Sequence, residues 1–297
     1  MNAKIRLFLN SNRGLSLLYL PAVLLFIVFV IYPLFSGINL SFTNWNGYSQ
    51  KYNYVGFDNY QKMLTDQRFK TAFINTLIYG FGSAILQNVF GLLYALLLNM
   101  KFKIRVLVRT IVYMPVIVAQ LIMGYVWYFL VQYDGGALNE IVALFHGEPI
   151  DWMGEKVRAV IIITVINAIQ FVGSSMIIYL AGLQGIPQSL NEAAIIDGAN
   201  SLKRLRFITF PLLMPSITTS FTLNLIGGLG LFATILSLTG GGPGYASHSL
   251  STLINYFYFS NQDAGYAAAI GIVTFIFMMS ISIATLKFFN KREVDYH

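Results

Sequence analysis

Six long apolar segments divide this chain, and they limit its fold more than any other feature of the sequence. A transmembrane helix needs about 20 mainly apolar residues. Only 10% of the residues are charged, against about 25% in an ordinary soluble domain. We therefore predict an all-α polytopic membrane protein with six transmembrane helices, at roughly Leu15–Phe35, Ala72–Asn99, Thr110–Val131, Ala159–Leu180, Leu212–Leu236 and Tyr266–Leu286.

The first apolar segment follows Lys4, Arg6 and Arg13, as the apolar part of a signal peptide would. It is longer than that part usually is, however, and no small-x-small cleavage site follows it. We interpret it as an uncleaved first span, in which Pro21 and Pro33 are expected to kink or end the helix.

The distribution of basic residues predicts the orientation. Of the 19 Lys and Arg residues, 13 lie in the two tails and in the loops between spans 2 and 3 and between spans 4 and 5. The positive-inside rule places that side in the cytoplasm, with both termini. The loop between spans 1 and 2 runs against this assignment, because it holds Lys51, Lys62, Arg68 and Lys70. The net charge of +7 is thus an orientation signal, and we expect no nucleic-acid partner.

None of the six predicted spans contains Asp, Glu, Lys, Arg or His. Carriers driven by protons or sodium ions generally place ionisable residues at membrane depth. We therefore expect a transported solute to be uncharged and the driving energy to enter from outside the bilayer.

Neutral polar residues do occur within the spans. Asn167, Gln170 and Ser174 are spaced to share one face of the fourth helix, and Phe171 lies among them. Asn224 and Gly228 lie in the fifth span. Interhelical contacts worth about 0.6 kcal/mol each are one explanation. As a set, these residues also suit a path for polyhydroxylated solutes, and further amides occur at Gln87, Asn88 and Gln120.

The loop between spans 4 and 5 predicts two short helices joined by a glycine. Ser189 and Glu192 form a capping box that would start a helix just after Pro187. Gly198 would stop it, and Ser201 would cap a second helix running to Pro211, whose apolar stripe is Leu202, Leu205 and Ile208. Such an elbow is suited to docking into a partner, although an amphipathic helix lying in the membrane interface fits the same pattern.

The sequence lacks the motifs of ATP hydrolysis and of metal binding. No G-x-x-x-x-G-K-[ST] sequence occurs, so the chain is not expected to hydrolyse ATP. The chain has no cysteine, and His146 and His248 lack metal-ligand spacing. We expect no catalytic residue and no metal site.

The same loop resembles that of a known family. It is similar to the motif of the membrane subunits of binding-protein-dependent ATP-binding-cassette (ABC) importers. The matching residues are Glu192-Ala193-Ala194, then Gly198, then Ile208-Thr209-Phe210-Pro211, with Phe210 in the usual Leu position. The sequence Asp197-Gly198-Ala199 resembles the one found at this position in the family members that transport sugars. Two further segments look like the maltose-type branch of the family. The first is Tyr32-Pro33 with Leu40-Ser41-Phe42-Thr43-x-Trp45, and the second is Leu238-Thr239-Gly240-Gly241-Gly242-Pro243 followed by Gly265-Tyr266-Ala267-x-Ala269.

The resemblance implies a type I ABC importer fold and a permease subunit that moves a sugar or oligosaccharide by alternating access. It implies a coupling helix between spans 4 and 5, at Glu192, Ala193, Ala194, Asp197 and Gly198, and a substrate path that includes Asn167, Gln170, Phe171, Ser174, Asn224 and Gly228. The implied partners are a second permease subunit, making a heterodimer, two cytoplasmic ATPase subunits that hold ATP and Mg²⁺, and an extracytoplasmic sugar-binding protein. No cofactor is expected on this chain.

The expected organisation is an N-terminal part at 1–70, the importer domain at 71–289 with its elbow at about 187–211, and a cytoplasmic tail at 290–297. A self-sufficient secondary carrier and a membrane enzyme that uses the polar cluster remain alternatives, as does glycerol phosphate or a polyol as the cargo of the same permease.

Overall fold

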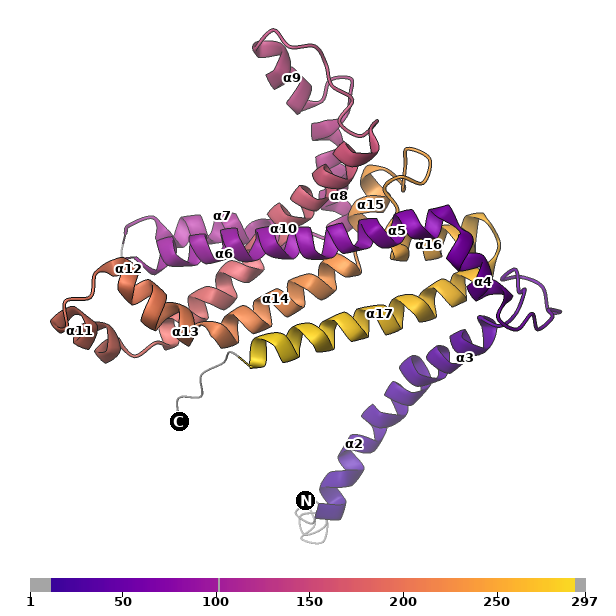
Figure 1. Ribbon diagram of the computed structural model, residues 1–297, viewed down its shortest axis with the longest axis horizontal. Coiled ribbons are helices and arrows are strands. Elements are labelled where there is room, and N and C mark those ends of the chain that lie inside the picture. The colour runs from indigo at the N-terminus through magenta and orange to yellow at the C-terminus, as the bar shows by residue number, and fades with distance from the viewer. Residues whose placement is uncertain (1–11, 101, 292–297) are drawn as a thin grey trace, which may run out of the picture. The chain divides into compact units, whose positions relative to one another are not determined.

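The structure is a computed structural model that describes residues 12–100 and 102–291. The described residues form helices and loops, with one isolated bridge between Thr43 and Tyr54. They divide into two compact units, one of residues 12–63 and 254–273 and the other of residues 64–100, 102–253 and 274–291. Figure 1 labels the helices of both units. Most of the predicted tail at 290–297 lies outside the described residues, as do Lys4, Arg6, Lys101 and Arg292.

Four helices in the described part are long and apolar enough to cross a membrane: Tyr19–Leu40, Gln67–Asn99, Lys156–Gly185 and Ala264–Asn290. Two bent pairs pass the same test, Arg105–Ile117 with Gln120–Val131 and Ser201–Leu212 with Met214–Leu229. The all-helical membrane class is confirmed. The count of six is reached if each bent pair makes one crossing, and it stays a prediction.

The second unit is built around two adjacent long helices. One is a continuous rod of α5 (Gln67–Leu77), η2 (Ile78–Gly82) and α6 (Ser83–Asn99), and the other is α10 (Lys156–Gly185). They lie side by side, flanked by α7 (Arg105–Ile117) and α14 (Met214–Leu229) (Figure 1). Small residues permit this close approach, since a Cβ added at Gly173 would lie 2.6 Å from the Val112 carbonyl oxygen.

The third predicted span, Thr110–Val131, is not one helix. It is divided into α7 and α8 (Gln120–Val131), which meet at 102°. Val118 and Ala119 between them have extended backbones, with ψ of 133° and 131°. The Gln170 side chain donates a hydrogen bond to the Val118 carbonyl (3.4 Å), which supplies a partner to a backbone group freed by the break.

The fifth predicted span, Leu212–Leu236, is also interrupted. It bends by 66° near Leu213, and α14 ends at Leu229, before α15 (Ala233–Leu238). Ser249 donates to the Leu231 carbonyl at 2.7 Å, so the polar backbone of this break also has a partner. Helix α15 packs on α8, and both breaks therefore lie in the same part of the second unit.

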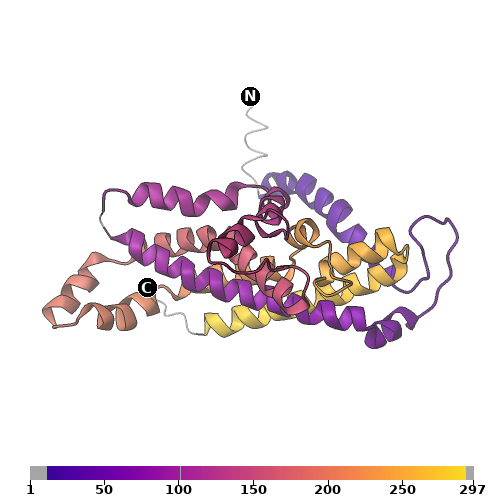
Figure 2. The ribbon, with the colours of Figure 1, turned by 90° about the horizontal axis from the view of Figure 1, so that it is seen from above.

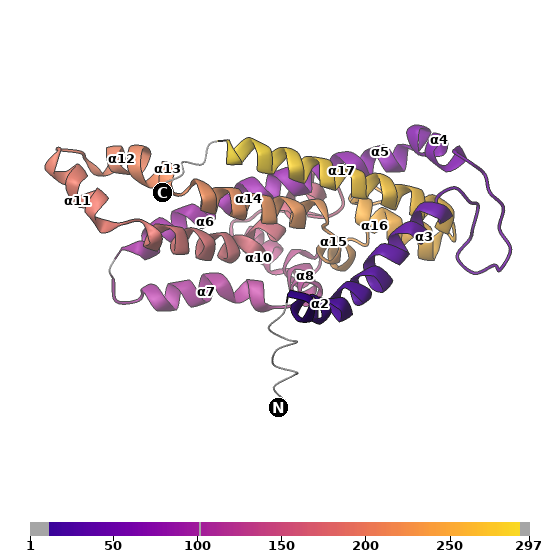
Figure 3. The same cartoon turned by 90° about the horizontal axis from the view of Figure 1, so that it is seen from below.

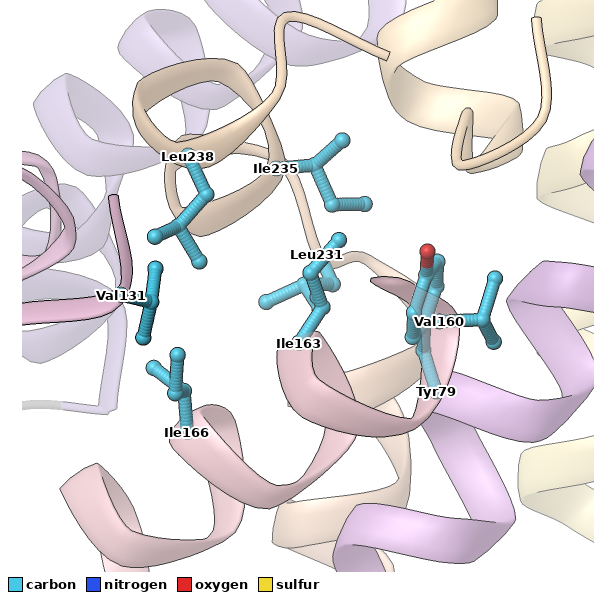
Figure 4. Close-up of a cluster of buried hydrophobic side chains, with 8 residues drawn as sticks. All are labelled: Tyr79, Val131, Val160, Ile163, Ile166, Leu231, Ile235 and Leu238. Atoms are coloured by element: carbon cyan, nitrogen blue, oxygen red, sulfur yellow. The ribbon is translucent and has the colours of Figure 1, made fainter. Parts of the chain in front are cut away.

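A hydrophobic cluster packs around these breaks. Figure 4 shows Leu231, Ile235 and Leu238 facing Val160, Ile163 and Ile166 of α10, with Tyr79 and Val131 beside them. All eight side chains are at most 4% exposed. Burial of this size stabilises a core by about 1.5–3 kcal/mol per large side chain, so the interrupted helices are held firmly in place.

The loop between α15 and α16 (Leu250–Asn255) is fixed to α5 and η2. The Asn75 amide donates to the carbonyls of Ala246 (2.7 Å) and His248 (3.0 Å), and the Tyr79 hydroxyl donates to that of Ser247 (2.9 Å). Gly241 has φ +97°, and a Cβ there would collide with the His248 ring. Burial lowers the pKa of His248, which favours the neutral imidazole.

The first unit contains α2 (Asn12–Phe26), η1 (Ile27–Ile31), α3 (Tyr32–Leu40), most of α4 (Asp58–Thr65), η4 (Tyr256–Ser260) and the start of α17 (Ala264–Asn290). Pro21 lies within α2 and Pro33 lies in the first turn of α3. Neither proline ends the helical run, which continues to Leu40.

Two of the segments that resemble the maltose-type branch meet in this first unit. The Gly265 backbone donates to the Trp45 carbonyl at 2.8 Å, and a Cβ at Gly265 would collide with the Thr43 carbonyl oxygen. The Asn59 amide donates to the carbonyls of Ser41 and Thr43, at 2.8 and 2.9 Å. A glycine is therefore required where the loop after α3 passes over the start of α17.

Candidate functional site

A cavity of about 280 Å³ lies among α6, α8, α10 and α14 in the second unit. Five of the six residues predicted for the substrate path line it, namely Asn167, Phe171, Ser174, Asn224 and Gly228. The other lining residues are Gln87, Gln120, Ile178, Leu223 and Gly227. None of the ten side chains is ionisable, so the cavity offers amides, a hydroxyl, an aromatic ring and apolar surface.

Several polar groups of this cavity are held by neighbouring helices. The Gln87 amide nitrogen donates to the Asn167 carbonyl at 3.0 Å. The Asn224 amide nitrogen donates to the Ser175 hydroxyl at 2.6 Å. The Gln87 amide oxygen is buried and has no hydrogen-bond partner in the described residues. A buried acceptor of this kind costs about 1–3 kcal/mol unless it is satisfied, and a hydroxyl group in the cavity would satisfy it.

Two adjacent glycines behave differently at this site. A Cβ at Gly228 would lie 2.7 Å from both the Ser83 hydroxyl and the Tyr79 carbonyl oxygen, whereas a Cβ at Gly227 would have nothing within 4 Å. Gly228 thus permits α14 to approach the η2–α6 rod, and Gly227 leaves open space in the cavity.

The sixth predicted path residue, Gln170, does not line the cavity. It is 1% exposed, and its amide nitrogen faces the Val118 carbonyl at the break between α7 and α8. Gln87 and Gln120, which do line the cavity, were absent from the predicted set. Like Asn167, each of them is an amide inside an apolar run, and this pattern could have identified them. The pattern of one helix does not predict which other helices face it, however, so the sequence did not bring these residues together.

Two hydrophobic clusters fix the part of α10 that carries the cavity residues. The cluster of Figure 4 uses Val160, Ile163 and Ile166, before the cavity residues in the helix. A second cluster joins Met176, Tyr179, Leu180 and Leu183 of α10 to Ala95 and Leu98 of α6 and to Leu213. Asn167, Phe171 and Ser174 lie between them in sequence, so their orientation follows from the packing on both sides.

The predicted elbow is present after α10. Helix α11 runs from Gln188 to Ile196 and ends at Asp197. Gly198 has φ +76°, and the Ala199 and Gly198 backbones donate to the carbonyls of Ala194 and Ile195. This is a Schellman ending, and the prediction that Gly198 stops the helix is confirmed.

The predicted caps of the two elbow helices are wrong. Pro187 has an extended backbone (ψ 129°) and occupies the N-cap position, so Ser189 already lies within α11 and cannot cap it. Glu192 instead accepts a hydrogen bond from the Gln188 side chain at 2.9 Å. In the second helix, Asn200 is the N-cap and accepts from the Lys203 backbone, which places Ser201 inside α12 (Ser201–Arg204).

After α12 the helical run continues through η3 (Leu205–Thr209) and α13 (Phe210–Leu212), close to the predicted end at Pro211. Figures 2 and 3 show the elbow projecting beyond the ends of α6 and α10 within the second unit. Its tip is apolar and exposed: Ile196 is 86% exposed, Leu202 71% and Phe207 68%.

The residues predicted to couple the elbow to a partner are mostly at its surface. Glu192, Ala193, Asp197 and Gly198 are exposed, and Ala194 is buried against the elbow itself. The small side chains and the apolar tip leave a surface onto which another protein can pack closely. Among the described residues, no group of His, Asp and Glu is arranged to hold a metal ion.

Comparison with known families supports this geometry. Residues 87–293 match the family model described as the inner membrane component of binding-protein-dependent transport systems. That segment contains the cavity residues from Gln87 onward and the whole elbow.

Two curated relatives extend over nearly the whole chain. The chain is 34% identical to the trehalose/maltose transport system permease protein MalF of Thermococcus litoralis, over 91% of this chain and 92% of the relative. It is 33% identical to the multiple sugar-binding transport system permease protein MsmF of Streptococcus mutans, over 98% and 99%. A chain of a bacterial ABC transporter that imports the acidic polysaccharide alginate has the same fold, with a TM-score of 0.83, 22% identity and coverage of 97% and 99%.

Proposed function

This chain belongs to the family of inner membrane components of binding-protein-dependent transport systems, and from that membership we propose that it forms the path for a sugar or oligosaccharide in an ATP-driven importer. It is a membrane-spanning permease subunit and not an enzyme. The observation that carries the sugar assignment is the cavity among α6, α8, α10 and α14, whose lining is polar but holds no ionisable side chain.

The chemistry of the cavity matches a neutral polyhydroxylated cargo. Amides and hydroxyls both donate to and accept from sugar hydroxyls, and Phe171 supplies a flat apolar face. Glycerol phosphate is disfavoured, because the lining contains no Arg or Lys to balance a phosphate. The names of the two relatives, which concern maltose, trehalose and multiple sugars, support the same choice.

The elbow supports a division of labour between subunits. We place Glu192, Ala193, Ala194, Asp197 and Gly198 at the contact with one of two ATPase subunits, which would bind ATP and Mg²⁺. The exposed apolar tip and small residues of the elbow favour a protein partner there. A second permease subunit would complete a heterodimer, and an external binding protein would deliver the cargo. Closure of the ATPases would then open the path toward the outside.

The basic residues place the elbow and both termini on the cytoplasmic side under the positive-inside rule. The distribution of Lys and Arg is the support for this topology.

Reconstitution tests the proposal. The full-length chain would be affinity-purified from the membranes of its own host with the subunits that remain bound, and reconstituted into liposomes with ATP inside. We expect uptake of a labelled oligosaccharide that requires both ATP and the binding protein. Uptake driven by an ion gradient without ATP would instead establish a secondary carrier, and turnover of a lipid or glycan by the chain alone would establish an enzyme.

A further inference from the structure

A basic pocket lies where α6 ends, α7 begins and α10 ends just before the elbow. Its volume is about 150 Å³, and it is lined by Leu98, Arg105, Val106, Arg109, Leu180 and Gln184. Arg105 and Arg109 are one helical turn apart in α7 and therefore share a face. Gln184 is the residue before the last of α10. The lining thus combines two arginines and a glutamine with three apolar side chains.

Within the part of the chain that the structure describes, neither arginine is paired with a carboxylate. The ion pairs in the described residues join Lys62 to Asp263 and Arg68 to Asp66. The sequence from residue 67 to residue 133 contains no Asp or Glu, and neither does α10. The helices that form the pocket therefore bring two positive charges and no negative one, and an anion from outside the chain would balance them.

An apolar groove continues directly from this pocket. It has a volume of about 280 Å³ and is lined by Tyr94, Leu97, Leu98, Met100, Phe102 and Val108, so Leu98 belongs to both. A third apolar hollow of about 450 Å³ shares Tyr94 with the groove and runs between α6 and α10, along Leu86, Phe90, Val165, Ile169 and Val172.

The three cavities thus follow α6 from Leu98, next to its end at Asn99, back to Leu86, near its start at Ser83. Leu98 lies 12 positions after Leu86, a rise of about 18 Å along the helix axis at about 1.5 Å per residue. That length suits an acyl chain, since half of a bilayer's hydrocarbon core is about 15 Å thick. The shape is a charged pocket with an apolar tail groove.

We propose that this surface binds an anionic phospholipid, with its headgroup phosphate between Arg105 and Arg109 and one acyl chain in the groove along α6. Bidentate arginine contacts to phosphate and an adjoining apolar groove fit one molecule that carries both features. The lipid would hold α6, α7 and α10 together beside the elbow. The substrate cavity lies on other residues of α6 and α10 and shares none with the three lipid-binding cavities.

The test uses the full-length chain, purified with its bound subunits, and native mass spectrometry with dioleoyl phosphatidylglycerol and dioleoyl phosphatidylcholine as probes. We expect retention of phosphatidylglycerol over phosphatidylcholine by about tenfold, falling to near equality in Arg105→Gln/Arg109→Gln. The matched control is Lys287→Gln/Lys291→Gln, which removes two exposed basic residues outside the pocket and should retain the preference. Equal retention of the two lipids by the wild-type chain, or equal loss in both double variants, would overturn the proposal.

Two further measurements do not depend on the folding of a variant. Phosphatidylglycerol with a photoreactive acyl chain should label peptides that contain residues 86–98 and 165–172 of the wild-type assembly. Labelling confined to other helices, or cross-links from the groove to another protein subunit in place of lipid, would contradict the lipid assignment. Inorganic phosphate at about 10 mM, roughly ten times the dissociation constant of a millimolar phosphate site, should not displace the lipid. Full displacement would show that the pocket is a site for free phosphate instead.

Discussion

The elbow and the substrate cavity are separated by only the last turns of α10, yet their surfaces are opposite in kind. In the cavity, polar side chains are held inside the bundle, as when Asn224 donates to Ser175 and Gln87 donates to Asn167. At the elbow, large apolar side chains are exposed, including Ile196 at 86%. The hydrogen bonds that hold these cavity amides come from this chain's own helices. The apolar tip of the elbow has no such cover in the described residues.

One cluster connects the two regions. Leu180 and Leu183 near the end of α10 pack with Leu213, which follows the elbow. Both stems of the elbow are therefore anchored in the same core, and a displacement of the elbow cannot leave this core unchanged, because close-packed interiors transmit strain. We infer that a partner pushing on the elbow would move the helices that line the cavity.

The largest expected effect comes from Glu192→Ala. Glu192 is exposed and has one contact in the described structure, with Gln188, so the free energy of unfolding should change by less than about 0.5 kcal/mol. ATP-driven uptake should fall by at least about tenfold, which is within the usual range of coupling energies between sites. Transport assays and thermal unfolding of the same preparations measure the two quantities.

Gln188→Ala is the matched control, because it removes the same hydrogen bond and leaves the carboxylate in place. It should transport normally. An equal loss of uptake in both variants would show that the contact within α11 matters and that Glu192 has no separate role toward a partner.

The next effect distinguishes the two glycines of α14. Gly228→Ala forces a methyl group against Ser83 and the Tyr79 carbonyl, and overpacking of this kind costs about 1–3 kcal/mol. Gly227→Ala adds the same methyl group to open space and should keep or raise the free energy of unfolding, by up to about 1 kcal/mol, because alanine favours a helix over glycine. Thermal unfolding in detergent compares them, and equal melting temperatures would mean that α14 does not approach the η2–α6 rod as closely as described.

A third pair of variants concerns two neighbouring serines of α10. Ser174 lines the cavity, so Ser174→Ala should weaken sugar binding by about fivefold, the effect of one hydrogen bond worth about 1 kcal/mol. Ser175 is buried and accepts from Asn224. Ser175→Ala should lower the free energy of unfolding by about 0.6 kcal/mol and reduce sugar affinity less than Ser174→Ala, because it acts only through the Asn224 amide that Ser175 holds. Isothermal titration calorimetry measures the sugar affinity of each variant, and thermal unfolding measures its stability. If Ser175→Ala weakened sugar binding more than Ser174→Ala, the cargo would not bind where Ser174 lines the cavity.

The sequence predicted the fold class, the elbow and half of the cavity lining because each depends on local pattern. Apolar runs of fixed length predict membrane helices, and Gly198 predicts a helix end from its own backbone preference. The amides at Asn167 and Asn224 stood out because polar residues are rare in such runs.

The features that the sequence did not predict depend on distant contacts. The break at Val118 has a carbonyl that is satisfied by Gln170, 52 residues later, and no local pattern indicates that pairing. Gln170 was therefore assigned to the path, although its side chain supports the break. The caps were wrong for a smaller reason: Pro187 and Asn200 each took the N-cap position one or two residues before the expected serine.

The smallest expected effect is local to the elbow. Asn200 caps α12 by accepting from the Lys203 backbone at 2.9 Å, and loss of an N-cap costs about 1 kcal/mol. Because the tip of the elbow is exposed, Asn200→Ala should raise hydrogen exchange about fivefold at residues 201–206 and leave the α10 amides at 160–180 unchanged. Asn200→Ser keeps a capping oxygen and should restore the wild-type rate. Faster exchange in both segments would show that the elbow and the cavity helices open as one cooperative unit, and the contrast between an exposed elbow and cavity helices held by their own packing would then be wrong.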